Sequence, residues 1–317
     1  MALALGDPIL SPGGLWDVLA RGGGDALARV VVLQLRLPRL VLGVMAGASL
    51  ALVGALLQDT KRNALAGPEL LGVTAGAALV LATITVFSLP VAFALYPLLG
   101  LAGSLCSGGV VLLAARPTRS PVRLALIGAA VSALLDAVMI SVISLGTQEQ
   151  VQLLYQYLLG SLANRTWDDV MQLLPWTAIG VPLALLCARP LNVLRLGDGV
   201  AEGLGLRVER TRVALLLVAT LLTAGAVAVV GGVAFAGLVG PHIARWLVGN
   251  DARRLFPLSA VVTAGLLVDA DILAQTALFL PLPLPPTSNV APSEWPVGAV
   301  TALLGAPFFL LLLRKRT

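Results

Sequence analysis

Long apolar runs recur along the whole chain and are separated by short polar segments. A run of about 18 to 20 apolar residues is long enough to cross the hydrocarbon core of a bilayer as an α-helix. The pattern therefore predicts an all-α, polytopic membrane protein with a single transmembrane domain over residues 1–317. About nine transmembrane helices are expected, at residues 40–58, 70–88, 91–114, 123–145, 171–188, 213–230, 232–248, 257–280 and 296–313.

Four segments depart from this pattern of simple spans. Residues 1–38 precede the first long run. Residues 148–170 carry apolar positions at helical spacing and include Trp167, which is typical of an amphipathic helix at a membrane surface. Residues 189–212 form a polar segment that is long enough to contain short helices. The run at 232–248 is short and rich in glycine, so we expect a broken or re-entrant helix there.

The distribution of basic residues predicts the orientation in the membrane. Nine helices alternate sides, and most of the 21 lysines and arginines share a side with the C-terminus. Because basic segments are retained in the cytoplasm, we expect the C-terminus and residues 189–212 to be cytoplasmic. Residues 1–38 and 148–170 are then external. An external N-terminus without an evident signal peptide predicts that a further span precedes Met1 in the native gene product.

Composition excludes several classes of function. Only 12% of the residues are charged and 58% are hydrophobic, whereas a soluble domain carries about 25% charged residues. The net charge of +5 is expected to lie against anionic membrane lipid, and no nucleic acid is expected as a partner. Two isolated cysteines and one histidine predict no metal site, and the sequence has no phosphate-binding loop. We therefore expect no cofactor, no enzymatic activity and no ATP binding by this chain itself.

Two arginines stand directly before the first apolar run, on the side that is otherwise poor in basic residues. Arg36 and Arg39 are three positions apart, so their side chains can project from one face. Arginine is well suited to holding a carboxylate in a bidentate pair. The pair therefore favours docking of an acidic protein surface from outside, or binding of an anionic ligand. The alternative is that both side chains are anchors that snorkel to the lipid headgroups.

Residues 196–210 combine small, apolar and acidic side chains on the predicted cytoplasmic side. A short helix with an apolar edge that stands outside the membrane favours a protein partner. The alternative is a helix that lies on lipid headgroups. The residues expected to couple this segment to a partner are Gly199, Ala201, Glu202, Leu204 and Gly205.

Five segments, in order along the chain, resemble the iron-chelate permease family of ABC importers, which serves iron-siderophores, ferric citrate, haem and cobalamin. They are RLPRL at 36–40, NALAGPELLG at 63–72, LGDGVAEGLGL at 196–206, GLVGPHIARWLVG at 237–249 and EWPVGAVTALLGAPFFLLLL at 294–313. The resemblance implies a permease subunit that moves an iron-siderophore-type chelate across the bacterial inner membrane by ATP-driven alternating access. It also implies ten spans in the family, of which the first is missing here.

The resemblance implies four kinds of partner. They are two ATP-binding subunits, a second permease subunit, a periplasmic or lipid-anchored substrate-binding protein, and membrane lipid. It assigns Arg36 and Arg39 to contact with the binding protein, and the family's third docking arginine falls at Gln275. Residues 196–206 match the coupling helices that sit in a groove of the ATPase.

The resemblance also implies a cytoplasmic gate in the connector after the first run. Asn63 and Leu65 match the asparagine and leucine of the family's gate turn. The proline of that turn is replaced by Ala64 in this chain, which loosens the expected turn.

Two other function classes are compatible with the residues. An ion- or proton-coupled secondary transporter would use carboxylates within the spans, which are functional candidates by default; these are Asp136, Asp269 and Asp271. An intramembrane hydrolase would need a serine nucleophile and a base; the candidates are Ser49 or Ser104 with His242. Transport that survives ATP depletion would indicate the former, and loss of activity in serine-to-alanine variants the latter.

Overall fold

The computed structural model describes residues 12–21, 23, 25–60, 66–67, 72–92, 95–115, 121–276 and 294–314. Within these ranges the chain is helical and contains no strand. Its helices are α1 (Pro12–Arg21), α2 (Ala26–Val30), the π-helical turn η1 (Val31–Arg36), α3 (Leu37–Thr60), α4 (Val73–Val86), α5 (Tyr96–Ala115), α6 (Pro121–Ile143), α7 (Gln148–Leu158), α8 (Trp167–Leu186), α9 (Ala188–Leu194), α10 (Asp198–Gly203), α11 (Val208–Val230), α12 (Ala236–Val248), α13 (Ala252–Thr276) and α14 (Val297–Arg314). The predicted all-α fold class is confirmed.

Each of the nine predicted spans coincides with a helix. Five described stretches are long and apolar enough to cross a membrane, namely Ala26–Thr60, Leu126–Ile143, Trp167–Leu186, Val208–Val230 and Ala252–Thr276. Shorter apolar helices occupy three further predicted spans, at Val73–Val86, Leu98–Val111 and Val297–Leu310. The remaining predicted span, at 232–248, corresponds to α12, which has only 13 residues and contains Pro241. Its shortness agrees with the broken helix that the glycine-rich sequence predicted.

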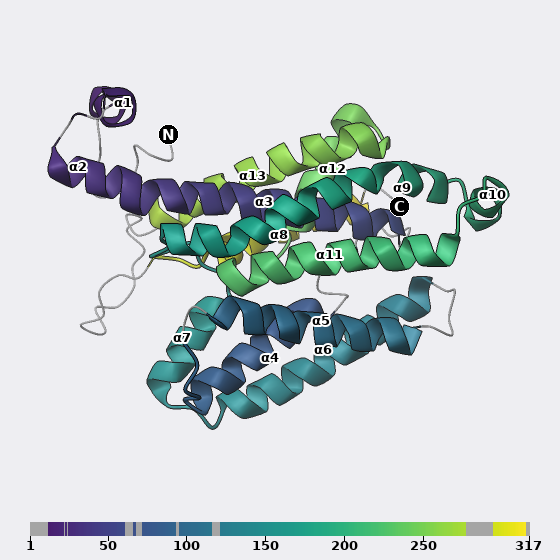
Figure 1. The fold of residues 1–317 in the computed structure, drawn as a ribbon, viewed down its shortest axis with the longest axis horizontal. Helices are drawn as coiled ribbons and strands as arrows, with labels where there is room; N and C mark the ends of the chain where they lie inside the picture. Colours follow the sequence, from purple (N-terminus) through teal and green to yellow (C-terminus); the bar gives the residue numbers. More distant parts are fainter. Residues whose placement is uncertain are drawn as a thin grey trace.

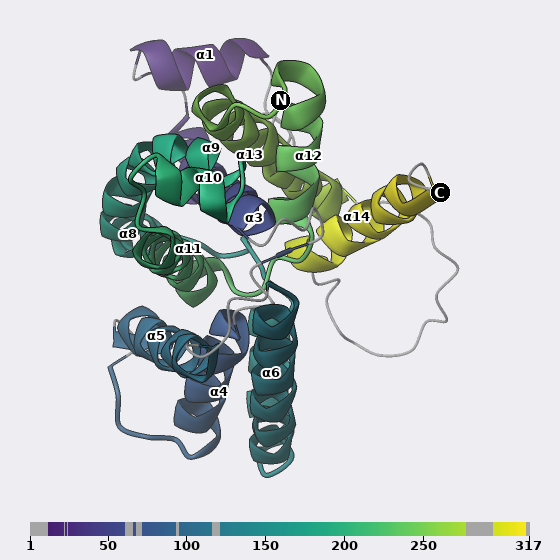
Figure 2. The same ribbon diagram turned by 90° about the vertical axis from the view of Figure 1, so that its right-hand side faces the viewer.

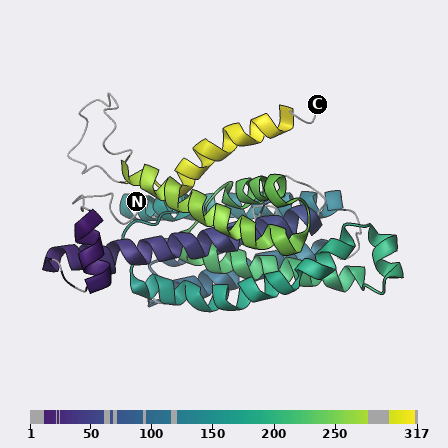
Figure 3. The ribbon, with the colours of Figure 1, turned by 90° about the horizontal axis from the view of Figure 1, so that it is seen from above.

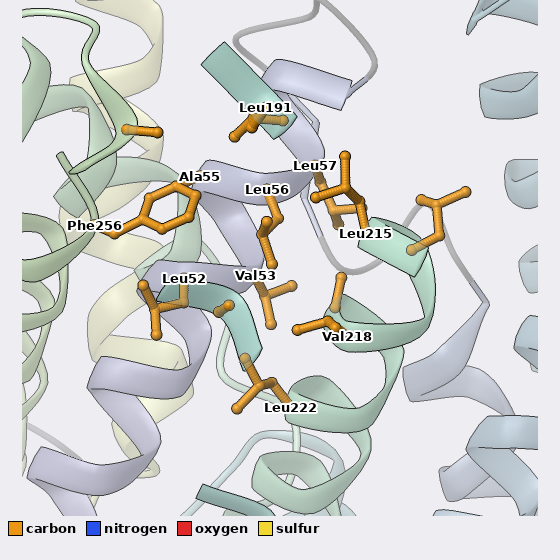
Figure 4. Packing of buried hydrophobic residues seen from close by; sticks show 14 of the residues in the cluster. Leu52, Val53, Ala55, Leu56, Leu57, Leu191, Leu215, Val218, Leu222 and Phe256 are labelled. Carbon is orange, nitrogen blue, oxygen red and sulfur yellow. The ribbon is translucent and has the colours of Figure 1, made fainter. Parts of the chain in front are cut away.

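Helix α3 is central to the fold. Helices α8, α11, α12 and α13 pack against it, and Figure 1 shows it running along the length of the molecule among them. Figure 4 shows Leu52 and Leu56 of α3 among side chains from three other helices, including Leu191 of α9, Leu215 of α11 and Phe256 of α13. Lipid tails are as apolar as these side chains, so close van der Waals packing is what favours this association in a membrane.

Helices α4, α5 and α6 form a second group. Helix α4 packs against α5 and α6, and α5 packs against α11 of the first group. Figure 2 shows α4, α5 and α6 as a separate layer below the helices that surround α3. Helix α14 packs against α12 and α13, and Figure 3 shows it diverging from them toward its C-terminal end.

The first span begins much earlier than the sequence predicted. Helices α2, η1 and α3 form one continuous helix over Ala26–Thr60, so the later part of the predicted external segment 1–38 continues the span. Its 35 residues extend about 50 Å, which exceeds the roughly 30 Å of bilayer hydrocarbon. The sequence placed the start of this span at residue 40, just after Pro38, a residue whose ring and missing backbone donor disfavour the interior of a helix. The π-helical turn directly before Pro38 widens the backbone and accommodates the ring.

The same π turn anchors a second helix. The Leu37 backbone N–H donates to the Val32 carbonyl, five residues back, and the Leu33 carbonyl accepts the indole N–H of Trp167 at 2.8 Å. Trp167 is the first residue of α8, so the predicted amphipathic segment 148–170 was drawn too long. Helix α7 supplies its helical part and ends at Leu158. A position of α7 at the external membrane surface stays a prediction.

Candidate functional site

Polar side chains gather near the two ends of α3, which lie toward opposite ends of the molecule in Figure 1. We call the first group the Arg39 end, and it comprises Arg36, Arg39, Arg165, Asp271, Gln275 and Glu294. We call the second group the α10 end, and it comprises the short helices α9 and α10 with the helix ends that contact them. Each end contains one of the two interaction sites that the sequence predicted.

At the Arg39 end, a bidentate ion pair joins two helices that are distant in sequence. Arg39 Nε and Nη2 each donate to a carboxylate oxygen of Asp271 in α13, both at 2.7 Å. The remaining guanidinium nitrogen of Arg39 lies 2.8 Å from Glu294 Oε2, just before α14. Gln275 Nε2 donates to Asp271 at 2.9 Å. The Arg39 side chain is only 13% exposed, so this pair fixes α3 against α13 and the start of α14.

A cleft of about 240 Å³ opens beside this ion pair. Arg36 and Arg39 line it from the continuous helix Ala26–Thr60, and Asp271 lines it from α13. Arg165, in the turn before α8, lines it too, and its Nη1 lies 3.1 Å from Asp169. The two arginines predicted for docking therefore share one cleft, but Arg39 is bound to two carboxylates of its own chain. A contact of Arg36 and Arg39 with a partner stays a prediction.

At the α10 end, the predicted coupling residues divide into exposed and buried positions. Gly199, Glu202, Leu204 and Gly205 are exposed, whereas Ala201 is fully buried in the main core cluster. Leu204 exposes 64% of its surface although it is apolar. Figure 1 shows α10 at the extreme end of the molecule, beyond the other helices. Ala201 therefore positions α10, and the four exposed residues are available to a partner.

The end of α10 is set by a glycine. Gly205 has φ +81°, a left-handed conformation that costs a residue with a side chain about 1 kcal/mol. The Gly205 N–H donates to the Glu202 carbonyl and the Leu206 N–H donates to the Ala201 carbonyl, both at 2.9 Å. This pair of bonds is the Schellman arrangement that closes a helix C-terminus. Both Leu204 and Gly205 are exposed at this closure.

Both residues predicted to form the cytoplasmic gate lie outside the described residues. Asn63 and Leu65 belong to the connector between α3 and α4, of which only residues 66 and 67 are described before Gly72. The gate therefore stays a prediction. Within the described ranges, no group of three or more histidine, cysteine, aspartate or glutamate residues could hold a metal ion.

The candidate residues of a secondary transporter and of an intramembrane hydrolase are not arranged as proton carriers or as a nucleophile and base. Asp271 is held by Arg39, which removes it as a free proton carrier, while Asp136 and Asp269 are exposed on their helices. The Ser49 hydroxyl donates to the Met45 carbonyl at 2.8 Å. The Ser104 hydroxyl donates to the Val73 carbonyl at 2.9 Å, and the His242 ring packs edge-on against Trp246 and Phe308. Neither serine donates to His242, so the proposed nucleophile and base are not paired.

Comparison with known proteins identifies relatives over nearly the whole chain. Residues 1–315 match the model of the FecCD transport family. The Fe(3+)-citrate import system permease protein YfmD of Bacillus subtilis (strain 168) is 39% identical over 289 residues, which are 90% of this chain and 82% of that protein. The cobalamin import system permease protein BtuC of Halobacterium salinarum is 38% identical over 318 residues, covering 98% and 82%. A solved inward-facing structure assigned to the metal-chelate type of ABC transporter superimposes with a TM-score of 0.86 at 27% identity, covering 99% of this chain and 94% of that chain.

Proposed function

The chain belongs to the FecCD transport family and is a permease of the ABC importer class, and we propose that it carries an iron chelate of the siderophore class across the bacterial inner membrane. The observation that carries this proposal is the match over residues 1–315, supported by 39% identity to an Fe(3+)-citrate permease. The chain does no covalent chemistry itself in this role. Its contribution is a pathway that is open to one side of the membrane at a time.

The ATPase partner is proposed to dock at the α10 end. Exposed Leu204 offers an apolar contact and exposed Glu202 a charged one, a combination that suits a groove on a partner protein. Buried Ala201 and the Schellman closure at Gly205 hold these side chains in a fixed direction. Two ATP-binding subunits would then drive the change between outward-facing and inward-facing states. The α10 end and the C-terminus are cytoplasmic under this assignment.

The substrate-binding protein is proposed to dock at the Arg39 end, which is then external. Arg36 lines the cleft there and adds positive charge beside Arg39 and Arg165, which are ion-paired within the chain. An acidic surface on the binding protein would be steered toward this charge, and the attraction would weaken with salt. Specificity for one chelate is assigned to that partner.

Two further parts of the assembly are proposed from the family resemblance. A second permease subunit completes the pathway, as either an identical or a related chain. Asn63 and Leu65, outside the described residues, would narrow the pathway at its cytoplasmic end.

The proposal is tested by reconstitution of the chain with the ATPase and binding protein encoded beside it. Proteoliposomes containing ATP are mixed with binding protein and with radiolabelled ferric citrate, a ferric hydroxamate or cobalamin in separate assays. We expect uptake of one iron chelate that requires both ATP inside and binding protein outside. Uptake of cobalamin alone would keep the importer but overturn the substrate class. Uptake driven by a proton or sodium gradient without ATP would overturn the importer in favour of the secondary transporter.

A further inference from the structure

One carboxylate at the α10 end joins three helices. Asp59, next to the last residue of α3, accepts from Arg195 Nη2 on one oxygen. Its other oxygen accepts from Arg245 Nη2 of α12 at 3.1 Å. Arg195 directly follows α9, so α3, α9 and α12 meet at this single side chain. The three side chains are between 11% and 21% exposed, which places the cluster largely out of water.

The neighbouring residue extends this cluster along α12. Gln58 Oε1 accepts from Arg245 Nη1, and Gln58 Nε2 donates to the Gly237 carbonyl at 3.3 Å. Gly237 lies in the first turn of α12 and Arg245 in its last turn. The end of α3 therefore holds α12 near both of its ends. Gln58 is only 2% exposed, so water does not replace these bonds.

Helix α9 is also tied to the beginning of α13. Asn192 Nδ2 donates to Asp251 at 2.7 Å, and Asn192 Oδ1 accepts the Ala252 backbone N–H at 2.9 Å. Together with the Asp59 cluster, these bonds connect α9 to α3, α12 and α13. Helix α9 also packs against α3 and α13 directly. By contrast, an ion pair of α10 joins Asp198 to Arg212 of α11, at 2.8 Å.

These contacts define a path from the short helices into the bundle. We propose, on the basis of the proposed function, that Asp59 is a positioning residue that transmits displacement of α9 and α10 to α3, α12 and α13 during the ATP-driven cycle. A carboxylate bound by two arginines resists sliding, because separation would leave buried charges unpaired. Helices α3, α12 and α13 would therefore move with α9 as one body.

The test compares ATP hydrolysis and chelate uptake in the same reconstituted complex. Asp59→Asn keeps the shape of the side chain but removes the charge that holds two arginines. We expect the complex to assemble and hydrolyse ATP, while uptake per ATP hydrolysed falls about tenfold. Asp59→Glu, which keeps the charge, should restore part of this ratio. Arg195→Gln, which leaves Asp59 paired with Arg245, should lower it as well.

Arg254→Gln is the matched control, because it removes the charge of an exposed arginine at the start of α13, whereas Asp59 is held by Arg195 and Arg245. Its uptake per ATP should stay within about twofold of the wild type. A wild-type ratio in Asp59→Asn would overturn the proposal. So would a parallel fall of hydrolysis, uptake and assembly that Asp59→Glu does not correct, since that pattern indicates a purely structural role. If Asp59→Asn does not assemble, the ratio in Arg195→Gln decides in the same way. A wild-type complex without ATP-dependent uptake would refute the proposed function itself.

Discussion

Gly54 of α3 and Gly237 of α12 meet backbone to backbone. A Cβ atom added at Gly54 would overlap the Gly237 carbonyl group, and one added at Gly237 would lie 2.7 Å from the Leu50 carbonyl oxygen. The obstacles are backbone atoms, which no side-chain rotation can move away. Close approach of helices through small residues is a common packing mode in membranes. Here it lets the end of α3 reach Arg245 and hold α12.

Enlarging Gly54 should separate these two helices. Gly54→Val is expected to lower the free energy of unfolding by about 3 kcal/mol, because the overlap cannot relax locally. The measurement is the thermal unfolding of the purified protein in detergent. Gly265→Ala is the matched control, since a Cβ at that helical position meets nothing within 4 Å. Equal stability of the two variants would show that α3 and α12 are not held this closely.

The glycine that ends α10 gives a prediction that distinguishes the effect of its backbone conformation from the effect of added side-chain volume. Gly205→Ala should cost about 1 kcal/mol, because the left-handed φ of +81° is unfavourable for alanine. It should also weaken ATPase docking by tilting Leu204. Gly199→Ala is exposed and has free space around it, so its folding stability should match the wild type. The checks are unfolding in detergent and the affinity for the ATPase subunit. Identical docking affinity in wild type and Gly205→Ala would mean that the Schellman closure does not orient the site.

Asp251 gives a pH dependence outside the membrane-spanning helices. The Arg253 backbone N–H and the Asn192 side chain donate to it, and these bonds lower the pKa of Asp251 below its usual range. A lowered folded-state pKa stabilises the fold above the unfolded-state pKa of about 4, and this contribution is lost as the pH falls through the folded value. Asp251→Asn should therefore unfold with a shallower pH dependence between about pH 5 and pH 2. Superimposable pH profiles of the two proteins would contradict this.

The apolar runs were sufficient to predict the helices, because the length and hydrophobicity of a span are local properties. For the polar residues 189–212 the sequence indicated only that the segment is long enough to contain short helices, without their bounds. The continuity of the first helix through Pro38 was missed, because it depends on a π turn whose Leu33 carbonyl is satisfied by Trp167, 134 residues away. No local pattern around Pro38 contains that information.

For the site residues, too, local sequence patterns did not reveal contacts between residues that are distant in the sequence. Arg39 and Asp271 were each singled out from the sequence, one as a docking residue and the other as an intramembrane carboxylate. Their pairing across 232 residues turns two separate candidates into one structural contact. Similarly, Ala201 and Glu202 are neighbours in one motif, yet only the packing of α10 shows that the first is buried and the second exposed.

The two arginines of the Arg39 end should differ in what their loss removes. Arg39→Gln leaves the largely buried Asp271 without its bidentate partner, so it should lower the free energy of unfolding by about 3 kcal/mol. Arg36→Gln leaves the Arg39–Asp271 ion pair in place, so this particular loss of stability is not expected. It should instead slow association of the binding protein about tenfold at low salt and reduce the salt dependence of that rate. The measurements are thermal unfolding in detergent and stopped-flow association at several salt concentrations.

A double variant distinguishes a structural Arg39 from a docking Arg39. Asp271→Asn on its own leaves Arg39 paired only with Glu294, and the combination of Arg39→Gln with Asp271→Asn replaces the ion pair by two amides. The double variant should lose less stability than the sum of the single losses, because no buried charge is stranded between the two positions. Additive losses would show that the pair contributes no coupling energy. If Arg39→Gln slows association as much as Arg36→Gln while stability is unchanged, Arg39 must leave Asp271 to contact the binding protein, and the ion pair is then a resting contact that docking replaces.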